Sequence, residues 1–359
     1  MPKFAYVVEP SIIYRYSVQP DGSLSPLDPP VSCENAIGIA CSNASRFQEG
    51  GDYIFVVSNG IDGESGSGIS IYHVESDGSL TMRIDHSQSD TVSEDAFFIT
   101  AMYLSGPNAY FIYIDSRSAK SRISGYQFIA PNSITALGPR GEPAISLPPG
   151  FQEQMLSYLE IVSPDGAPLP YIYALYPAEL VSYTTRVDGR LKYAGFSAGG
   201  YDSASQIAAP PNGDFAYVPF FDGSVLGYKM QAGNFNPLGS VTQLPSFGTA
   251  AITSRDGKYL FISVAASPVD GGGTDAVFSF KIGPDGSLTP LDQKPCGPVT
   301  TMLVTEPGGQ YLYALAGEGV GIIYIYEINA DGTLTPKPPE SKHSGRSVFG
   351  MVVLEMLPG

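Results

Sequence analysis

One short phrase recurs along this chain, and it limits the folds that the chain can adopt. The copies are PDGSLSPLD at 20–28, SDGSLTMRID at 76–85, VDGRLKYAG at 187–195, PDGSLTPLD at 284–292 and ADGTLTPKP at 330–338. Their Asp-Gly pairs begin at positions 21, 77, 188, 285 and 331, so two of the gaps are about twice the other two. We therefore expect two degenerate copies, near 132–134 and 233–235. Seven copies with a period of about 50 residues are typical of the blades of a β-propeller.

The segments before each copy alternate apolar and aromatic residues in the manner of β-strands. Examples are the runs at 53–57 and 69–74, and those at 215–218 and 225–228. Apolar alternation with aromatic and β-branched residues favours strands over helices. The Asp-Gly pair suits a tight hairpin that needs a positive φ angle. We expect this turn to join the third strand of each blade to the outermost one, so the phrase is turn chemistry and carries no site.

These patterns predict an all-β fold, a seven-bladed β-propeller with four antiparallel strands in each blade. The N-terminal segment supplies three strands, at 4–8, 12–18 and 23–27. The C-terminal run at 347–356 supplies the missing innermost strand of the same blade. Pairing of the two ends closes the ring and removes an open sheet edge. Residues 1–359 are then a single domain.

Composition excludes several classes of function. The formal charge of −16 argues against binding to nucleic acid and to anionic membrane surfaces. Turn and polar residues interrupt every apolar run before it could cross a membrane. The first strand begins at Phe4, which leaves no room for a signal peptide, so we expect a cytoplasmic protein. A trimmed leader and the sequon at Asn43 leave secretion open.

The cysteines do not indicate a disulfide framework or a metal site. The chain has three cysteines, Cys33, Cys41 and Cys296, and no CxxC pair or Cys/His cluster. A bond between Cys33 and Cys41 is possible, but free and inert thiols are the expectation. We expect no metal and no cofactor.

The blade phrase Pro-(Asn/Asp)-Gly-x-(Phe/Tyr)-x-Tyr-Val with its outer strand DGSLTPL resembles the lactonase-type propellers. These are the six-phosphogluconolactonase-like proteins and the fungal carboxy-muconate lactonising enzyme. Members with lactone chemistry carry an Arg, two His and a Glu in a blade whose nearest match here is SASQIAAPPNGDFAYVPFF at 203–221. Ser205 stands at the Arg position, Gln206 and Pro210 at the His positions and Phe221 at the Glu position. None of these four residues can act as a general acid or base tuned near neutral pH.

The resemblance implies a site in the central channel, where first strands begin and second strands end. A concave, mostly apolar pocket with a few polar groups is the usual form of a small-molecule site. The expected catalytic residues are Arg346, Gln206 and Glu160, because the first two can bind substrate oxygens and the third is a candidate acid or base. The expected substrate-binding residues are Phe220, Phe221, Phe349, Tyr158, Ser205, Thr300, Tyr176 and Phe98.

Three functions fit these residues. The loss of the Arg/His/Glu set and the aromatic channel mouth resemble the fungal hetero-Diels–Alderases of tropolone–sesquiterpenoid biosynthesis. That resemblance implies a cofactor-independent enzyme that joins a tropolone quinone methide to a humulene-type alkene. The second function is that of a lactonase or lactonising enzyme with relocated groups, such as Glu160 with Arg346. The third is that of a non-catalytic propeller that binds a ligand or a protein. The sequence does not decide the oligomeric state.

Overall fold

The computed structural model describes most of the 359 residues. The described ranges are 1–33, 35–42, 52–58, 68–84, 96–105, 108–115, 120–130, 133–136, 158–162, 171–176, 179–186, 188, 190–198, 204–266, 275–298, 300–316, 321–340 and 348–356. For residues 96–162 within these ranges, the backbone alone is described. All regular elements in these ranges are β-strands, as the sequence predicted. Within them, no helix is long and apolar enough to cross a membrane.

The described strands form seven antiparallel sheets. From the inside outward, the first sheet contains β28 (Gly350–Glu355), β1 (Lys3–Glu9), β2 (Ile12–Val18) and β3 (Leu24–Pro26), and β4 (Val31–Ser32) also pairs with β2. The second contains β5 (Ala36–Ser42), β6 (Asp52–Ser58), β7 (Gly68–Val74) and β8 (Leu80–Ile84). The third contains β9 (Ala96–Ser105), β10 (Asn108–Asp115), β11 (Lys120–Ala130) and β12 (Ser133–Ala136).

The remaining four sheets follow in chain order. The fourth contains β13 (Tyr158–Val162), β14 (Tyr171–Leu175), β15 (Glu179–Thr185) and β16 (Leu191–Ala198). The fifth contains β17 (Phe215–Pro219), β18 (Ser224–Gln231) and β19 (Asn234–Gln243). The sixth contains β20 (Phe247–Thr253), β21 (Tyr259–Ala265), β22 (Ala276–Ile282) and β23 (Leu288–Pro295), and the seventh contains β24 (Thr300–Thr305), β25 (Tyr311–Ala316), β26 (Ile322–Ile328) and β27 (Leu334–Glu340).

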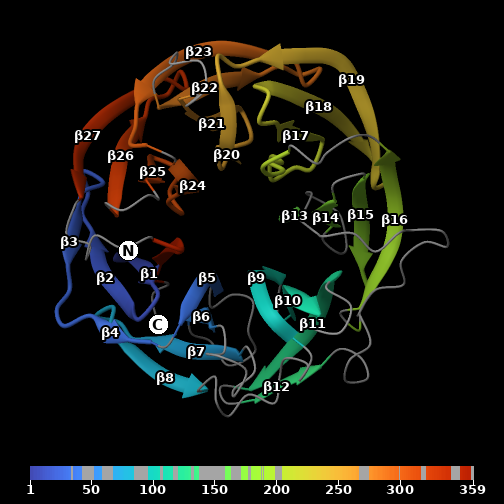
Figure 1. Cartoon of the computed structure of the whole chain (residues 1–359). Helices are drawn as coiled ribbons and strands as arrows, with labels where there is room; N and C mark the ends of the chain where they lie inside the picture. The colour runs from blue at the N-terminus through green and yellow to red at the C-terminus, as the bar shows by residue number, and fades with distance from the viewer. Residues whose placement is uncertain are drawn as a thin grey trace.

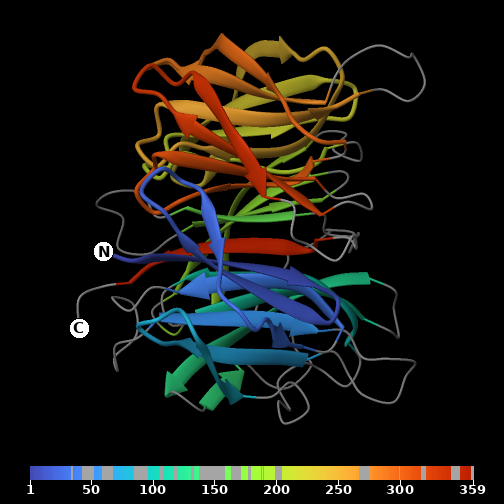
Figure 2. The same cartoon turned by 90° about the vertical axis from the view of Figure 1, so that its left-hand side faces the viewer.

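The sheets stand around a central axis, with the first strand of each sheet nearest to it (Figure 1). Seen from the side, the strands run across the ring from one face to the other (Figure 2). The C-terminal strand β28 pairs with β1, from Lys3 opposite Glu355 to Val8 opposite Gly350. This is the pairing that the sequence predicted between the two ends of the chain, and the arrangement is that of a propeller-like fold.

The fifth sheet differs from the expected four strands for a local reason. Its innermost segment, 204–209, is joined to β17 only by two isolated bridges, Ala204 with Phe220 and Ala208 with Tyr217. Ser205 N–H donates to Pro219 O at 3.0 Å. Pro219 has no N–H group with which to return the bond, so the regular ladder is interrupted there.

The repeated phrase forms the turn that its sequence predicts. In the first sheet, Gly22 N–H donates to Gln19 O and Gln19 N–H donates to Ser23 O, both at 2.9 Å. Gly22 has φ +82°, a left-handed conformation that glycine adopts without strain. Asp21 Oδ1 accepts from Ser23 N–H at 3.0 Å and from Ser23 Oγ–H at 2.6 Å. The Ser or Thr two residues after the Asp is therefore part of the turn.

Turns of the same form occur at Asp77, Asp285 and Asp331. Each joins the third strand of its sheet to the outermost one, which confirms the expected position. The degenerate copy near 233 also forms a tight turn, with Ala232 at φ +50° and Gly233 at φ +85°. Asn132, in the other degenerate copy, lies outside the described residues.

The turn glycine is also the contact point between neighbouring sheets. A Cβ atom at Gly22 would lie 2.3 Å from the Tyr311 ring of the seventh sheet, and one at Gly332 would lie 2.2 Å from Tyr259 of the sixth. Gly78 meets the ring of Phe4, and Gly286 meets that of Phe215, in the same way. In these four pairs, one sheet packs an aromatic ring against the turn of the next sheet, and only glycine leaves room for it.

A tyrosine two residues after this aromatic residue, on the same strand, donates a hydrogen bond to the carbonyl oxygen of the turn glycine. Tyr313 Oη–H donates to Gly22 O at 3.0 Å, and Tyr217 and Tyr6 bond in the same way to Gly286 O and Gly78 O at 3.0 and 3.1 Å. These three phenols are buried, so the bond satisfies groups that water cannot reach. The aromatic-x-Tyr pattern and the Asp-Gly phrase are therefore two halves of one joint between sheets.

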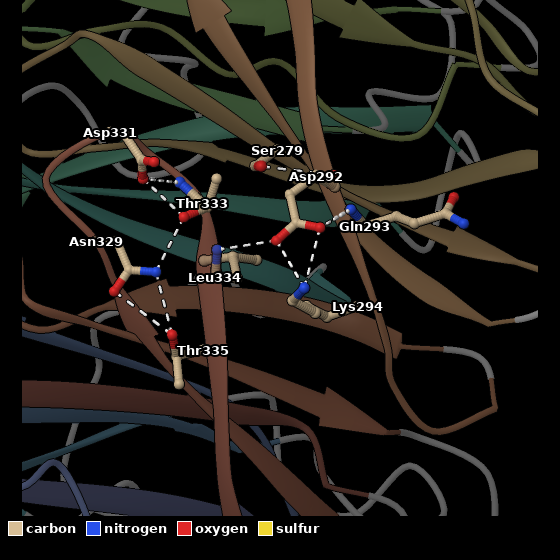
Figure 3. Close-up of polar contacts among 9 residues, drawn as sticks. All are labelled: Ser279, Asp292, Gln293, Lys294, Asn329, Asp331, Thr333, Leu334 and Thr335. Atoms are coloured by element: carbon tan, nitrogen blue, oxygen red, sulfur yellow. Dashed lines mark hydrogen bonds and ion pairs between the residues drawn. The ribbon is translucent and has the colours of Figure 1, made fainter.

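Polar contacts at the outer rim link the sixth and seventh sheets (Figure 3). The Asp292 carboxylate in β23 accepts from Lys294 Nζ at 2.8 Å, from Gln293 N–H at 2.8 Å and from Leu334 N–H at 3.3 Å. Leu334 opens β27, whose outer edge has no strand beside it. The side chain of one sheet thus satisfies an edge N–H of the next, and the prolines of β27 protect the rest of this edge from pairing with other chains.

Candidate functional site

The two faces of the ring differ in which strand ends they carry. One face carries the tight Asp-Gly turns, which join the third strand of a sheet to the outermost one. At the other face, innermost strands begin and second strands end. We call this second face the mouth face. Binding residues concentrate on the connections between rigid strands, and the predicted site residues lie at the strand ends of this face, so the mouth face is the place to examine for a site.

Gln206 lies near the start of the innermost segment of the fifth sheet and reaches across to the sixth. Its Oε1 accepts a hydrogen bond from Ala251 N–H at 2.7 Å. Ala251 lies in β20, which is the terminal strand of its sheet and has no further strand on the axial side. Gln206 is partly exposed. The expected site residue therefore has one structural bond already, which fixes how its amide is turned.

Ser205, beside it, also bonds to the backbone of its own sheet. Its Oγ–H donates to Pro219 O at 3.3 Å, in addition to the bond from its N–H to the same oxygen. The hydroxyl oxygen remains able to accept a bond from a ligand. Ser205 and Gln206 thus bring a hydroxyl and an amide to the mouth face, and neither group changes its charge near neutral pH.

Phe220 and Phe221, which follow β17, have opposite environments. Phe220 is buried, with 5% of its surface exposed, and packs in a cluster with Tyr173, Tyr228 and Phe235. Phe221 is 46% exposed, and its ring meets that of Phe247 edge-on with the centroids 6.5 Å apart. Phe221 is therefore available to a ligand, whereas Phe220 stabilises the packing of the fourth sheet against the fifth.

Phe349 is the second exposed aromatic residue at the mouth face. It lies directly before β28, it is 44% exposed, and its N–H donates to Val8 O at 2.9 Å. That bond holds the backbone at the start of the innermost strand while the ring stays free. Phe196, in the outer strand β16, is 52% exposed, so exposure alone does not mark a site; Phe221 and Phe349 differ from it in offering their apolar surface at the mouth face.

Thr300 and Tyr176 are placed as predicted, at a first-strand start and a second-strand end, but both are buried. The Thr300 hydroxyl bonds locally, to Gly297 O and to the Cys296 thiol, both at 3.3 Å. Burial raises the pKa of Tyr176 to about 12, so its phenol stays neutral. Their roles in binding a substrate stay predictions.

The other predicted residues lie beyond the described side chains. Arg346 falls outside the described residues. Glu160 and Tyr158 lie in β13, and Phe98 lies in β9. These are innermost strands of their sheets, as expected, with Glu160 opposite Tyr173 and Phe98 opposite Ile114. Their roles, too, stay predictions.

Phe247 is a mouth residue that was not predicted. It begins β20 and pairs its ring with Phe221. The signal for it in the sequence was weak, because Phe247 follows the short run Pro245-Ser246 and belongs to no repeated phrase. Phe220 O accepts from Gly248 N–H at 3.1 Å, and this bond brings the two segments together.

The described His, Cys, Asp and Glu side chains form no metal-binding cluster. No group of three or more His, Cys, Asp or Glu that could hold a metal occurs in this part of the chain. The described histidine, His73, lies in β7 with its Nδ1 3.1 Å from Glu75. Cys33, Cys41 and Cys296 are free thiols, which answers the question left open for the first two. Burial raises the pKa of Cys33 to about 12 and that of Cys296 to about 11, so these thiols stay protonated and inert.

Solved structures share this fold at low sequence identity. A Bacteroides uniformis protein described as a putative 6-phosphogluconolactonase has a TM-score of 0.74 and 17% identity, over 98% of this chain and 99% of its own. A Bacteroides fragilis protein of the same description has a TM-score of 0.71 and 16% identity, over 99% and 98%. A hypothetical selenium-binding protein from Sulfolobus tokodaii has a TM-score of 0.66 and 13% identity, over 98% of this chain and 95% of its own.

Neither a comparison with known protein families nor one with curated proteins finds a match. The structural likeness extends over nearly the whole chain and establishes a lactonase-like, propeller-like fold. Because the same fold carries proteins of different description, it does not by itself define the activity.

Proposed function

We propose that this protein is a cofactor-independent enzyme of secondary metabolism, an intermolecular hetero-Diels–Alderase built on a lactonase-like propeller. Its substrates are a tropolone quinone methide and a humulene-type sesquiterpene. The observation that carries the proposal is the composition of the described mouth face. It combines exposed phenylalanine rings with an amide and a hydroxyl that do not titrate, at positions where lactonase-like relatives carry Arg, His and Glu.

The same proposal takes the seven described sheets as seven blades of a closed ring. The β1–β28 pair completes one blade, and the innermost strands surround a central channel that opens at the mouth face. Contacts between innermost strands of neighbouring sheets, such as β28 with β5 and β20 with β24, support this arrangement.

The chemistry suits a site with few charges. A hydroxymethyl tropolone loses water to give the quinone methide, whose conjugated C=C–C=O unit is the heterodiene. The alkene then adds across it, forming one C–C and one C–O bond without release of a proton. Little charge develops in this step, so holding the two partners in near-attack geometry supplies most of the acceleration. An apolar site also keeps water away from the reactive quinone methide.

The residues divide between the two partners. Gln206 and Arg346 orient the tropolone oxygens, and Phe221 and Phe349 pack against the alkene. Phe220 supports them from the core, since it is buried. The exposed Phe221 ring can therefore be removed without disturbing the core. Phe221→Ala should lower the rate of product formation and leave the free energy of unfolding nearly unchanged.

Lactone hydrolysis is the second candidate, favoured by the descriptions of the two Bacteroides structures. On this reading Glu160 acts as the general base and Arg346 stabilises the oxyanion. Hydrolysis needs a titrating group, whereas the cycloaddition does not.

The test is to incubate the purified protein with a hydroxymethyl tropolone and humulene, and separately with sugar and aliphatic δ-lactones. The proposal expects a single enantiomer of the cycloadduct and a rate of cycloaddition that varies little between pH 6 and pH 8. Hydrolysis of a lactone with a bell-shaped pH profile, and a racemic adduct at the uncatalysed rate, would establish the lactonase instead. If neither reaction is accelerated, both enzyme proposals are wrong and the protein is a binding propeller.

A further inference from the structure

We infer that Gln206 is the specificity-determining residue of the mouth face and that it presents its Nε2 hydrogen-bond donors to the ligand. The substrate must therefore present an acceptor oxygen, such as a ring carbonyl, at its inner end and an apolar portion toward Phe221 and Phe247. This inference rests on the proposed function only in taking the mouth face as the site.

The orientation of the Gln206 amide follows from its partner. A backbone N–H can only donate, so the atom 2.7 Å from Ala251 N must be the amide oxygen. Turning the amide over would place its N–H groups against another N–H and would leave the Ala251 donor unsatisfied. A partly buried donor without a partner is costly, so the amide stays in one orientation.

The partner N–H belongs to an edge that the fold leaves open. Innermost strands pair on one side only, so their other row of N–H and C=O groups faces the axis. Gln206 satisfies one of these groups in β20 from the neighbouring sheet. A second side chain ties the same two segments together, since Thr253 Oγ1–H donates to Ala209 O at 2.9 Å. The position of Gln206 is therefore fixed from both sides of the joint between the fifth and sixth sheets.

The other end of the amide is left for a ligand. Gln206 Nε2 carries two N–H donors, and neither has a partner among the described residues, although the side chain is only partly exposed. The neighbouring Ser205 hydroxyl directs its proton to Pro219 O. A group that approaches Nε2 meets donors held in a fixed direction, which favours a neutral or anionic acceptor oxygen at this point.

The spacing along β20 gives the length of the ligand. Phe247 begins this strand and Ala251 lies four residues further in, which corresponds to roughly 13 Å at the usual rise per residue. The Phe221 ring contacts Phe247 at the outer end of this span. A molecule with an oxygen at one end and an apolar body of about this length fits between the amide and the aromatic pair.

The experiment compares two probes that differ only in the acceptor oxygen. They are a tropone with an eight-carbon alkyl chain and the cycloheptatriene with the same chain, titrated calorimetrically into the full-length protein at pH 8. Wild type should bind the tropone at least tenfold more tightly. Gln206→Glu keeps an acceptor for Ala251 N–H but replaces the free donors with an oxygen, and Gln206→Met removes both functions. Both variants should bind the two probes equally.

The matched control is Thr253→Val, which cuts the other bond between the same two segments. It should lower the melting temperature but preserve the preference for the tropone. If wild type binds neither probe, or if Gln206→Glu and Gln206→Met keep the tenfold preference, the inference is wrong. If the preference depends on Gln206 but the protein does not accelerate the cycloaddition, the inference holds and the proposed enzyme function fails.

Discussion

Replacing Gly332 with alanine tests the joint between sheets, because the substitution adds a single methyl group at the point of contact. Gly332 has φ +82°, and its new Cβ would lie 2.2 Å from Tyr259 Cδ1, well inside the contact distance of two carbon atoms. The left-handed conformation costs alanine about 1–2 kcal/mol. The displaced ring adds about 1–3 kcal/mol of overpacking. Gly332→Ala should therefore lower the free energy of unfolding by about 2–5 kcal/mol, measured from urea denaturation.

Gly239 supplies the control, since it has φ +76° and no atom within 4 Å of the position of a new Cβ. Gly239→Ala should cost about 1–2 kcal/mol, the conformational part alone. In a Tyr259→Ala background the ring is absent, so Gly332→Ala should cost no more than Gly239→Ala does. Equal losses for Gly332→Ala with and without the Tyr259 ring would refute the idea that the ring requires glycine.

Three further predictions concern the same turns and the thiols. Tyr313→Phe should lower the free energy of unfolding by about 1–2 kcal/mol because it leaves the buried Gly22 carbonyl unpaired, whereas Tyr259→Phe, whose bond to Ala330 O is exposed, should cost less; equal losses would contradict this reading. Hydrogen bonds from Ser or Thr lower the pKa of Asp21, Asp77, Asp285 and Asp331, so their stabilisation is complete above pH ~4 and is lost as the pH falls through the lowered folded-state values. The urea midpoint should fall in that window, and a variant with Asn at all four positions should show a shallower fall; an unchanged slope would exclude these turns as the cause. Cys33 and Cys296 should react slowly with a thiol reagent at pH 8 in the native protein and faster once it is unfolded, and rapid native labelling would contradict their raised pKa values.

The fold could be predicted because its signals are local. The phrase Asp-Gly-Ser/Thr contains the side-chain donors and acceptors of its own turn, as the bonds of Asp21 to Ser23 demonstrate. The spacing of the copies then indicates which residues belong to each sheet. The pairing of β28 with β1 follows because the N-terminal segment supplies three strands of a sheet and the C-terminal segment supplies one. What the phrase did not reveal is that its glycine is required by the aromatic ring of another sheet.

The site was less predictable because it depends on contacts between distant segments. Gln206 and Ala251 are 45 residues apart, and nothing in either segment indicates that an amide would bond to that N–H. Phe220 and Phe221 are neighbours of the same residue type, but side chains alternate in direction along the chain, so one ring lies in the core and the other on the surface. Phe247 lies outside any repeat, so only the folded ring brings it to Phe221.

The structure of the protein with the alkyl tropone bound shows whether Gln206 donates to an acceptor oxygen at the mouth face. We expect the ligand on the axis at the mouth face, with its carbonyl oxygen within about 3 Å of Gln206 Nε2 and its chain against Phe221 and Phe247. A ligand bound at the opposite face among the Asp-Gly turns or on the outer strands, or a mouth ligand turned with its carbonyl away from Gln206, would contradict it.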